Sequence, residues 1–336
     1  MLAAVFKGPG KPLEIEKLPD PEPGPGQLLL KIVRCGICAT DILMTGDNAF
    51  TVPNGYVLGH ERGAEVIAVG KGVERFRVGD HVVPHNTRGC GTCDDCRAGT
   101  PFFCTSMEMN MAGFAQYMVC DERFCAPVPH ALSLADAALV EPLAVGLHAC
   151  QLTGDLKGKR VVVLGAGPMG LATIYWARLL GVDRIATIAT SRQREAIARG
   201  MGSDAFLTNG ADLGGEVAEA LGGQADIVFE ATGAPGTIAQ SADLVKARGT
   251  VTVIGMCAHA DTWTPAWPML KELRIQFGVG TSLAQFEQVA DTLAAGHVEP
   301  RLMVTDTVSM GQLPSSFEAL KSQSHQCKVM LDPWAD

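Results

Sequence analysis

Hydrophobic and polar residues alternate in the first part of the chain in the way expected of β-strands. Residues 13–16 read Leu-Glu-Ile-Glu, and a longer apolar run occupies residues 27–33. A segment rich in proline and glycine, residues 19–26, separates the two as a rigid turn. The β pattern continues over residues 57–69 and 80–83, with glycines at the bends. These segments predict a twisted, antiparallel, barrel-like domain.

The pattern changes near residue 142, where strand-like and helical segments begin to alternate. Short apolar runs predict strands at 159–164, 185–189, 225–230 and 250–254, and helical periodicity predicts helices at 142–152, 191–201, 236–247 and 283–295. Such alternation implies a doubly wound parallel sheet with helices on both faces. The tail from about residue 297 returns to short β-like segments. We therefore expect an α/β domain, residues 143–296, inserted into a first domain formed by residues 1–142 and 297–336.

Length and composition agree with a two-domain globular protein. A chain of 336 residues is too long for one core, and its 47% hydrophobic and 19% charged residues are ordinary for a soluble enzyme. The net charge of −9 argues against nucleic-acid or membrane-surface partners. No apolar run is long enough for a signal peptide or a membrane span. Eleven cysteines then favour metal binding or free thiols over disulfides, and the cytoplasm is the expected location.

Four cysteines lie close together in the arrangement Cys90-x2-Cys93-x2-Cys96-x7-Cys104. Four thiolates at this spacing can surround one zinc ion and leave no coordination position open, which is typical of a structural site. In the bacterial iron–sulfur run the last cysteine follows after three residues and precedes proline, unlike the spacing here. The motif predicts a structural zinc ion, and free buried thiols are the alternative.

A glycine-rich loop follows the apolar run 161–164 and opens a helical segment. Gly165 allows a tight turn, Gly167 lets a pyrophosphate approach the backbone, and Gly170 lets helix and strand pack closely. Free N–H groups at the start of the helix favour phosphate binding. Because the loop joins a strand to a helix, it predicts a dinucleotide site. We assign to this site Gly165, Gly167, Pro168, Met169 and Gly170.

The next strand bears on the choice between NAD and NADP. An NAD site places Asp or Glu about 20 residues further on, bonded to the ribose 2′-hydroxyl, but Ala189 stands at that place. The hydroxyls of Thr190 and Ser191 and the guanidinium of Arg192 suit a 2′-phosphate instead. The sequence thus favours NADP over NAD. Arg194 is a further candidate, with a solvent-facing surface residue as its alternative role.

A second metal site is indicated by Gly59-His60-Glu61, which follows Cys38 by about twenty residues. A thiol, an imidazole and a carboxylate can hold a catalytic zinc ion and leave one position open. Adjacent strand residues point to opposite faces, so His60 and Glu61 can both bind the ion only if the backbone bends. Gly59 makes such a bend plausible. A turn with a buried histidine and a surface glutamate is the alternative.

These motifs occur in an order and spacing that resemble the zinc-dependent medium-chain alcohol dehydrogenases over essentially the whole chain. The resemblance rests on residues 35–41, 59–61 and 79–83, together with the four cysteines and the glycine-rich loop. Residues 141–150 are similar to the polyol branch, which includes sorbitol, butanediol, glucose and threonine dehydrogenases. The resemblance implies a GroES-like catalytic domain with an inserted Rossmann domain.

The resemblance also implies roles for individual residues. Cys38 and His60 would bind the catalytic zinc. Glu61 or Glu141 would supply the carboxylate, one directly and the other through water or by exchange. Asp41 would lie behind these ligands and support them.

Proton transfer would follow a different route from that of many relatives. Thr40 would relay the proton of the substrate hydroxyl. In many relatives a histidine two residues after the aspartate completes the relay, but Leu43 stands there. Ribose hydroxyls and water would carry the proton, with His85 as a further candidate.

Together these features predict an oxidoreductase that interconverts a secondary alcohol or polyol and its ketone, or an alcohol and its aldehyde. It would use two zinc ions per chain and NADP(H), with the nicotinamide near Thr232, Gly233 and Gly255 at the carboxyl ends of their strands. The alternatives are an NAD-dependent enzyme similar to threonine dehydrogenase and a non-catalytic NADPH-binding protein. The resemblance implies a small-molecule substrate and a homodimer or homotetramer, formed through residues 274–277.

Overall fold

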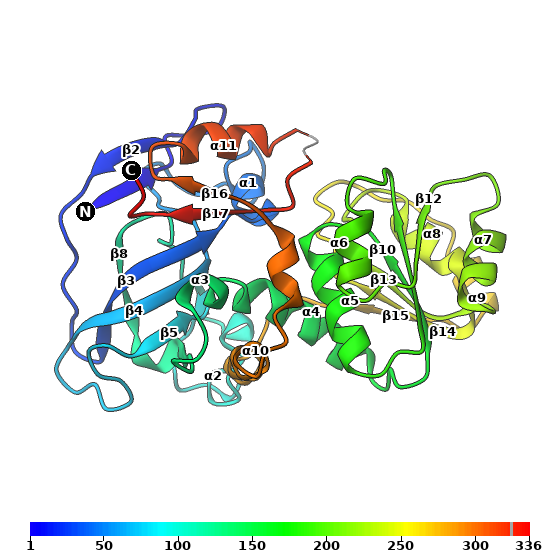
Figure 1. Cartoon of the computed structure of the whole chain (residues 1–336), viewed down its shortest axis with the longest axis horizontal. Coiled ribbons are helices and arrows are strands. Elements are labelled where there is room, and N and C mark those ends of the chain that lie inside the picture. Colours follow the sequence, from blue (N-terminus) through cyan, green and yellow to red (C-terminus); the bar gives the residue numbers. More distant parts are fainter. Residues whose placement is uncertain (323–324) are drawn as a thin grey trace. The chain divides into compact units, whose positions relative to one another are not determined.

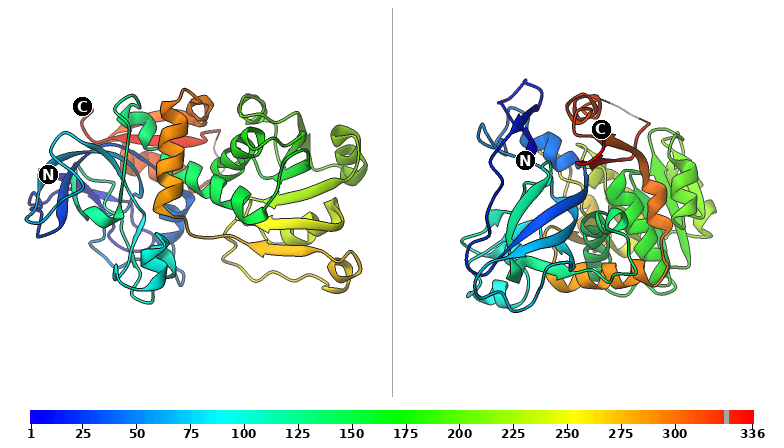
Figure 2. Two further views of the ribbon diagram at one scale, coloured as in Figure 1. Left: turned by 90° about the horizontal axis from the view of Figure 1, so that it is seen from below. Right: turned by 60° about the vertical axis from the view of Figure 1, so that its left-hand side comes forward.

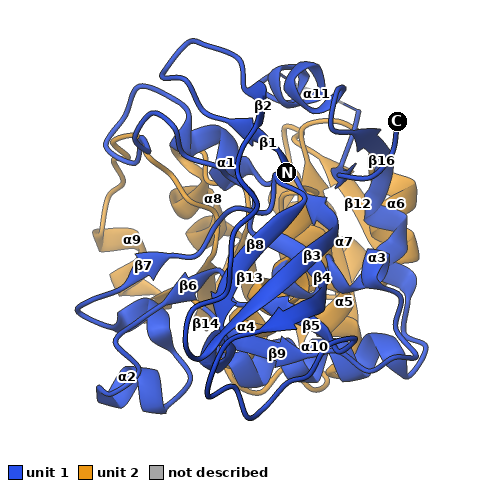
Figure 3. Cartoon of the chain, turned by 90° about the vertical axis from the view of Figure 1, so that its left-hand side faces the viewer, with its two compact units in different colours: residues 1–141, 281–336 blue, residues 142–280 orange. Residues whose placement is uncertain are grey.

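The computed structural model describes residues 1–322 and 325–336. The chain divides into two compact units (Figure 3): unit 1 comprises residues 1–141 and 281–336, and unit 2 comprises residues 142–280. The sequence-based division placed the second boundary at residue 296, whereas the structure includes helix α10 (Leu283–Ala294) in unit 1. This helix belongs there because its apolar side is buried against unit 1, with the Phe286 ring 4.8 Å from that of His85.

Unit 1 is built on a curved sheet centred on β3 (Gln27–Gly36), as Figure 1 shows. Strand β3 pairs antiparallel with β4, β8 and β17. The other strands of this sheet are β4 (Glu61–Val69), β5 (His81–Pro84), β8 (Tyr117–Asp121), β9 (Cys125–Pro127), β16 (Val304–Ser309) and β17 (Lys328–Asp332). Two short pairs complete the unit: β1 (Leu2–Val5) with β2 (Glu14–Lys17), and β6 (Thr87–Arg88) with β7 (Glu108–Met109).

The predicted alternation along β3 produces the core of unit 1. Leu28, Leu30 and Ile32 are fully buried on one face, while the residues between them are partly exposed. The helices of this part of the chain are α1 (Ala39–Met44), α2 (Asp94–Arg97), α3 (Leu134–Ala137), α4 (Val140–Thr153), which continues into unit 2, α10, α11 (Leu313–Ala319) and the 3-10 helices Pro101–Phe103, Glu122–Phe124 and Glu299–Met303. Helix α11 was missed by the sequence analysis, which expected only β-like segments in the tail. It forms because Leu313 and Phe317, one turn apart, reach the core.

Unit 2 contains a parallel six-stranded sheet in the order β12-β11-β10-β13-β14-β15. Its strands are β10 (Arg160–Leu164), β11 (Arg184–Ala189), β12 (Ala205–Thr208), β13 (Ala225–Glu230), β14 (Val245–Val253) and β15 (Arg274–Phe277). Its other helices are α5 (Pro168–Leu179), α6 (Glu195–Gly200), α7 (Leu213–Leu221), α8 (Thr237–Leu244) and α9 (Ala266–Leu270). Helices α5 and α6 cover one face, and α7 and α8 cover the other (Figures 1 and 2).

The chain moves outward from β10 through β11 to β12 and then returns to β13, beside β10. The order of the strands therefore reverses between β10 and β13, where α/β sheets of this kind bind dinucleotides. The predicted doubly wound parallel sheet is confirmed.

Strand β12 and helix α7 were not predicted, because the strand has only four residues and Gly214 and Gly215 weaken the helical pattern. Among the described residues, no helix is long and apolar enough to cross a membrane.

Candidate zinc and dinucleotide sites

Asp41 connects the two segments that carry the predicted catalytic ligands. Cys38 caps the start of α1, and Asp41 is fully buried three residues later. Asp41 Oδ2 accepts a hydrogen bond from the Cys38 N–H at 2.9 Å, and Oδ1 accepts one from the Gly59 N–H at 3.0 Å. The same Oδ1 lies 3.2 Å from His60 Nδ1. A carboxylate on one ring nitrogen of a histidine orients the other nitrogen toward a metal.

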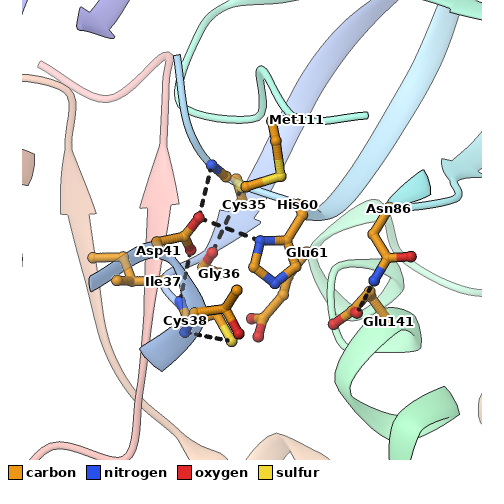
Figure 4. Close-up of polar contacts among 12 residues, drawn as sticks. Cys35, Gly36, Ile37, Cys38, Asp41, His60, Glu61, Asn86, Met111 and Glu141 are labelled. Atoms are coloured by element: carbon orange, nitrogen blue, oxygen red, sulfur yellow. Dashed lines mark hydrogen bonds and ion pairs between the residues drawn. The ribbon is translucent and has the colours of Figure 1, made fainter. Parts of the chain in front are cut away.

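The backbone bends sharply at Gly59, as the sequence suggested. Gly59 has φ +89°, and a Cβ atom there would come within 2.6 Å of the Phe114 ring. Because of this bend, His60 and the first residue of β4, Glu61, turn to the same side. One ligand atom each from Cys38, His60 and Glu61 lies within 4.8 Å of the others. Figure 4 shows the three side chains directed toward a common space.

Glu61 is held by a residue that the sequence analysis missed. The Lys328 ammonium donates to Glu61 Oε1 at 2.5 Å and to the Ile37 carbonyl at 3.1 Å. Burial lowers the pKa of Lys328, but Glu61, Cys38 and Cys327 together raise it above the ordinary value. A lysine within the apolar run of residues 327–331 is a signal that could have revealed this pair.

The second oxygen of Glu61 provides a test of whether a metal ion fits. Glu61 Oε2 is buried and has no hydrogen-bond partner among the described residues. An unsatisfied buried acceptor costs about 1–3 kcal/mol. A zinc ion beside Cys38 and His60 would give this oxygen a partner, and thiolate, imidazole and carboxylate are the donors that zinc prefers. The residues present therefore fit a zinc ion.

Glu141, the other candidate carboxylate, is held outside this group. Its Oε1 accepts a hydrogen bond from Asn86 Nδ2 at 2.7 Å, and burial raises the pKa of Glu141 to about 7. The group of three ligand atoms within 4.8 Å contains Glu61 and not Glu141. The structure thus brings Glu61, rather than Glu141, next to Cys38 and His60.

The charge around this group is predominantly negative. Burial alone would lower the pKa of His60, but Asp41 and Cys38 raise it well above its usual value. Within the described part of the chain, Lys328 is the one cation ion-paired to Glu61. Buried charges of one sign require a counter-charge. A divalent cation would supply it.

The residues considered for proton transfer differ in their surroundings. Thr40 lies half-buried in the first turn of α1, two residues after Cys38, and Leu43 lies one turn further along. His85 is buried, with Nδ1 3.1 Å from the Thr87 carbonyl and Nε2 3.2 Å from that of Thr281. Burial lowers the pKa of His85 to about 4. Both ring nitrogens of His85 thus lie against backbone carbonyls, and its part in proton transfer stays a prediction.

The four-cysteine segment forms a compact group around α2. Sulfur atoms of Cys90, Cys93, Cys96 and Cys104 lie within 4.8 Å of one another. Backbone N–H groups point at them: Cys90 N donates to Cys104 Sγ at 3.3 Å, and Cys93 N donates to Cys90 Sγ at 3.3 Å. Four sulfur atoms at this separation, each able to be a thiolate, fit a tetrahedral zinc ion without an open position.

The glycine-rich loop of unit 2 has the geometry expected of a phosphate-binding turn. Gly165 has φ +111°, and its N–H donates to the Ile188 carbonyl at the end of β11 at 2.8 Å. Gly167 caps α5, whose first residue is Pro168, followed by Met169. A Cβ atom on Gly170 would come within 2.0 Å of the Gly165 carbonyl oxygen. The close approach of helix and strand therefore requires glycine at position 170.

The two candidate arginines after β11 differ in their contacts. Arg192 is exposed and forms an ion pair with Glu195 at 2.7 Å. Arg194 turns back over the glycine-rich loop, and its Nη1 lies 3.3 Å from the Ala166 carbonyl oxygen. Thr190 and Ser191 are exposed beside them. Arg194 is thus the arginine nearest the phosphate-binding turn, a position that sequence spacing did not reveal.

Comparison with known proteins identifies the family of the chain. The description "Alcohol dehydrogenase GroES-like domain" matches residues 24–130, and "Zinc-binding dehydrogenase" matches residues 168–295. Sorbitol dehydrogenase from Ovis aries is 30% identical over 95% of this chain and 93% of its own length. L-threonine 3-dehydrogenase from Saccharopolyspora erythraea is 32% identical over 99% of both proteins. The chain belongs to the zinc-dependent medium-chain dehydrogenases.

Within this family the chain falls in the polyol branch, so the predicted resemblance is confirmed. A candidate zinc-binding dehydrogenase from Sinorhizobium meliloti 1021, solved with bound NADP, has a TM-score of 0.89 at 27% identity and covers 99% of both chains. The GroES-like domain and the Rossmann domain of the prediction are confirmed as well. This medium-chain dehydrogenase is accordingly an oxidoreductase of the alcohol and polyol class, with zinc and a nicotinamide cofactor.

Proposed function

We propose that this dehydrogenase interconverts a secondary alcohol or polyol and its ketone by hydride transfer with NADP(H). The observation that carries the proposal is the buried group of Cys38, His60 and Glu61, in which Glu61 Oε2 has no partner among the described residues. The same chain has a glycine-rich loop at the end of β10. The proposed zinc-dependent reaction uses both a zinc site and a dinucleotide site.

Each residue of the first group has a role in the proposal. Cys38, His60 and Glu61 hold the catalytic zinc, and Glu141 acts through water or by exchange with Glu61. When bound, the zinc ion supplies Lewis acidity that polarises a carbonyl or lowers the pKa of a hydroxyl group. Asp41 orients the His60 ring, and Lys328 holds the Glu61 carboxylate in place.

Three further roles complete the assignment. The Thr40 hydroxyl relays the proton of the substrate hydroxyl. The cysteines of the four-cysteine segment hold a second zinc ion, which stabilises a loop. Gly165, Gly167 and the start of α5 bind the pyrophosphate.

The preference for NADP rests on charge around the end of β11. Ala189 stands where an acid would bind the 2′-hydroxyl of NAD, so the end of β11 itself places no carboxylate against a 2′-phosphate. Thr190, Ser191 and Arg192 offer donors, and we add Arg194 because its guanidinium lies over the loop. An NAD-dependent enzyme acting on a 2-amino-3-hydroxy acid is the second candidate, supported by the identity of 32% with L-threonine 3-dehydrogenase.

A substrate panel with four cofactor forms tests the proposal. Ketones would be offered with NADPH and NADH, and sorbitol, 2,3-butanediol and L-threonine with NADP and NAD. We expect turnover of a polyol or its ketone with the NADP pair, and loss of turnover when the Cys38 thiol is removed. Activity that survives in a metal-free Cys38→Ser variant would refute the zinc mechanism. Turnover of L-threonine with NAD alone would favour the second candidate.

A non-catalytic NADPH-binding protein is a weaker alternative, because it would not need a buried ligand group.

We also propose a homodimer or homotetramer joined through the edge strand β15, with Phe277 62% exposed in the single chain. An unpaired strand edge is a common site for association. Sedimentation of the zinc-loaded protein would measure the oligomeric state.

A further inference from the structure

Glu230 occupies the position in unit 2 where the strand order reverses. It is the last residue of β13 and pairs in register with Leu164, the last residue of β10. Dinucleotides bind in the crevice outside the carboxyl ends of the strands at such a reversal. Glu230 is nevertheless only 1% exposed. Acidic residues are almost never buried to this extent unless they have partners that require them there.

Among the described residues, the hydrogen bonds to Glu230 Oε1 come from the loop that follows β13 and from the first residue of α8. This oxygen accepts hydrogen bonds from the Thr232 N–H at 2.8 Å, the Gly233 N–H at 3.1 Å and the Thr237 hydroxyl at 3.0 Å. The Thr232 hydroxyl donates to the same oxygen. One carboxylate oxygen thus fixes the backbone of the loop and the first turn of α8.

The loop after β14 also lies against this carboxylate, and the loop after β10 lies against Thr232. A Cβ atom on Gly255 would come within 2.6 Å of Glu230 Oε2 and 2.2 Å of the Gly233 nitrogen. A Cβ atom on Gly165 would come within 3.0 Å of Thr232 Cγ2. Gly233 itself has φ +66°. Three loops at the carboxyl edge of the sheet therefore pack around Glu230 without room for a side chain between them.

The charge of Glu230 restricts which part of a dinucleotide can lie beside it. A carboxylate repels the pyrophosphate, which is instead drawn to the free N–H groups at the start of α5. The N–H groups of Thr232 and Gly233 are already bonded to Glu230 and cannot serve a phosphate. The side of the crevice next to Glu230 is left for the part of the cofactor beyond the pyrophosphate that carries no negative charge of its own, the nicotinamide ring and the hydroxyls of its ribose.

We propose that Glu230 is a positioning residue for the nicotinamide half of the cofactor, acting through the loop of Thr232 and Gly233. The inference rests on the proposed NAD(P)-dependent function and deepens it. Glu230 does not contact the reacting atoms in this proposal; it holds the loop backbone in the conformation that receives the ring.

The experiment compares two ligands and matched variants of the zinc-loaded protein. NADPH contains both halves of the cofactor, whereas 2′,5′-ADP contains the adenosine half alone. Dissociation constants for both would be measured by calorimetry for the wild type, Glu230→Gln and Thr237→Val. Asp226→Asn is the control, because Asp226 lies on the same strand at its opposite end, where it bonds the Arg160 N–H at 2.8 Å and pairs with Lys246 at 2.5 Å.

Glu230→Gln should raise the Kd of NADPH about tenfold or more, because an uncharged amide oxygen accepts the hydrogen bonds of the loop more weakly than a carboxylate does. Thr237→Val removes one neutral donor and should raise it about threefold. The Kd of 2′,5′-ADP should stay within about twofold for every variant, and Asp226→Asn should leave both constants within that range.

Two results would overturn the inference: an unchanged Kd of NADPH in both Glu230→Gln and Thr237→Val, or equal loss of NADPH and 2′,5′-ADP binding. The second result would mean that Glu230 merely supports the fold. Failure of the wild type to bind NADPH or NADH would refute the proposed function itself. That outcome is read from the wild type alone, so the two failures are distinguishable.

Discussion

Replacing Lys328 by methionine would remove the buried positive charge that pairs with Glu61. The two side chains are 1% and 0% exposed, and their charged atoms are 2.5 Å apart. Methionine keeps most of the volume of lysine, so the change acts mainly on charge. Breaking a buried ion pair from one side costs about 3–5 kcal/mol, because the remaining charge is left uncompensated.

Zinc should change the size of this effect. In the metal-free protein Glu61 would lose its counter-ion, whereas in the zinc-loaded protein the metal would replace the lost charge. For a unit of about 200 residues, each kcal/mol shifts Tm by roughly 2–4 °C, so the metal-free variant should unfold about 10 °C below the metal-free wild type. The Tm of the zinc-loaded variant should fall by less than half of that amount, relative to the zinc-loaded wild type.

Calorimetric melting of both forms would test the reasoning, with Lys321→Met as the matched control. Lys321 pairs with Glu318 on the surface, where the side chains are 30% and 41% exposed, and such pairs contribute about 0–1 kcal/mol. If Lys328→Met melts no lower than Lys321→Met in the metal-free form, the ion pair does not hold Glu61. Equal loss in both forms would refute a metal ion beside Glu61.

Four further variants test the metal site, the choice of cofactor and an ion pair of unit 1. Cys38→Ser should abolish turnover and lower the zinc content from two ions per chain to one, with the Kd of NADPH unchanged; loss of NADPH binding as well would indicate misfolding instead. Arg194→Ala should raise the Kd of NADPH about 10- to 100-fold and leave that of NADH nearly unchanged, since a charge-assisted hydrogen bond is worth about 1.5–3 kcal/mol. Arg192→Ala should also raise the Kd of NADPH more than that of NADH. An equal rise in both dissociation constants in these two variants would refute the NADP assignment. The hydrogen bonds from Arg301 lower the pKa of Asp136 below its value of about 3.9 in unfolded chains. The pair therefore stabilises the fold fully above about pH 3.9, and this stabilisation is lost as the pH falls through the lowered pKa of the folded protein. Urea unfolding should therefore show a larger deficit of Asp136→Asn at pH 7 than at pH 3, and an equal deficit at both would contradict the pairing.

Much of the fold could be predicted because each unit has a strong periodic signal. Alternation along residues 27–33 corresponds to β3, and the buried runs before Gly165 and around residue 228 correspond to β10 and β13. Elements whose stability comes from distant packing were missed. Helix α11 depends on apolar contacts with strands far away in the sequence, and β12 is too short to stand out.

The site could be predicted only as far as local motifs extend. Cys38 and His60 follow from the motifs and the resemblance, but the choice between Glu61 and Glu141 depends on the bend at Gly59 and on the Asn86 bond. The pair of Lys328 and Glu61 joins residues 267 positions apart, a separation that no spacing rule connects.

Loop conformation set a second limit on the prediction. The sequence favoured Arg192 over Arg194 for the 2′-phosphate, yet Arg192 pairs with Glu195 and Arg194 reaches the Ala166 carbonyl. Side-chain direction in a loop depends on the backbone geometry there, which composition does not determine.

The central claim, that Cys38, His60 and Glu61 bind a catalytic zinc ion, is tested most directly by measuring zinc content and turnover on the same preparations. Wild-type protein and His60→Ala would be analysed by mass spectrometry of the metal and by reduction of the best ketone with NADPH. We predict two zinc ions per chain and activity for the wild type, and one zinc ion without activity for His60→Ala. Equal zinc content and equal turnover in the two proteins would contradict the claim.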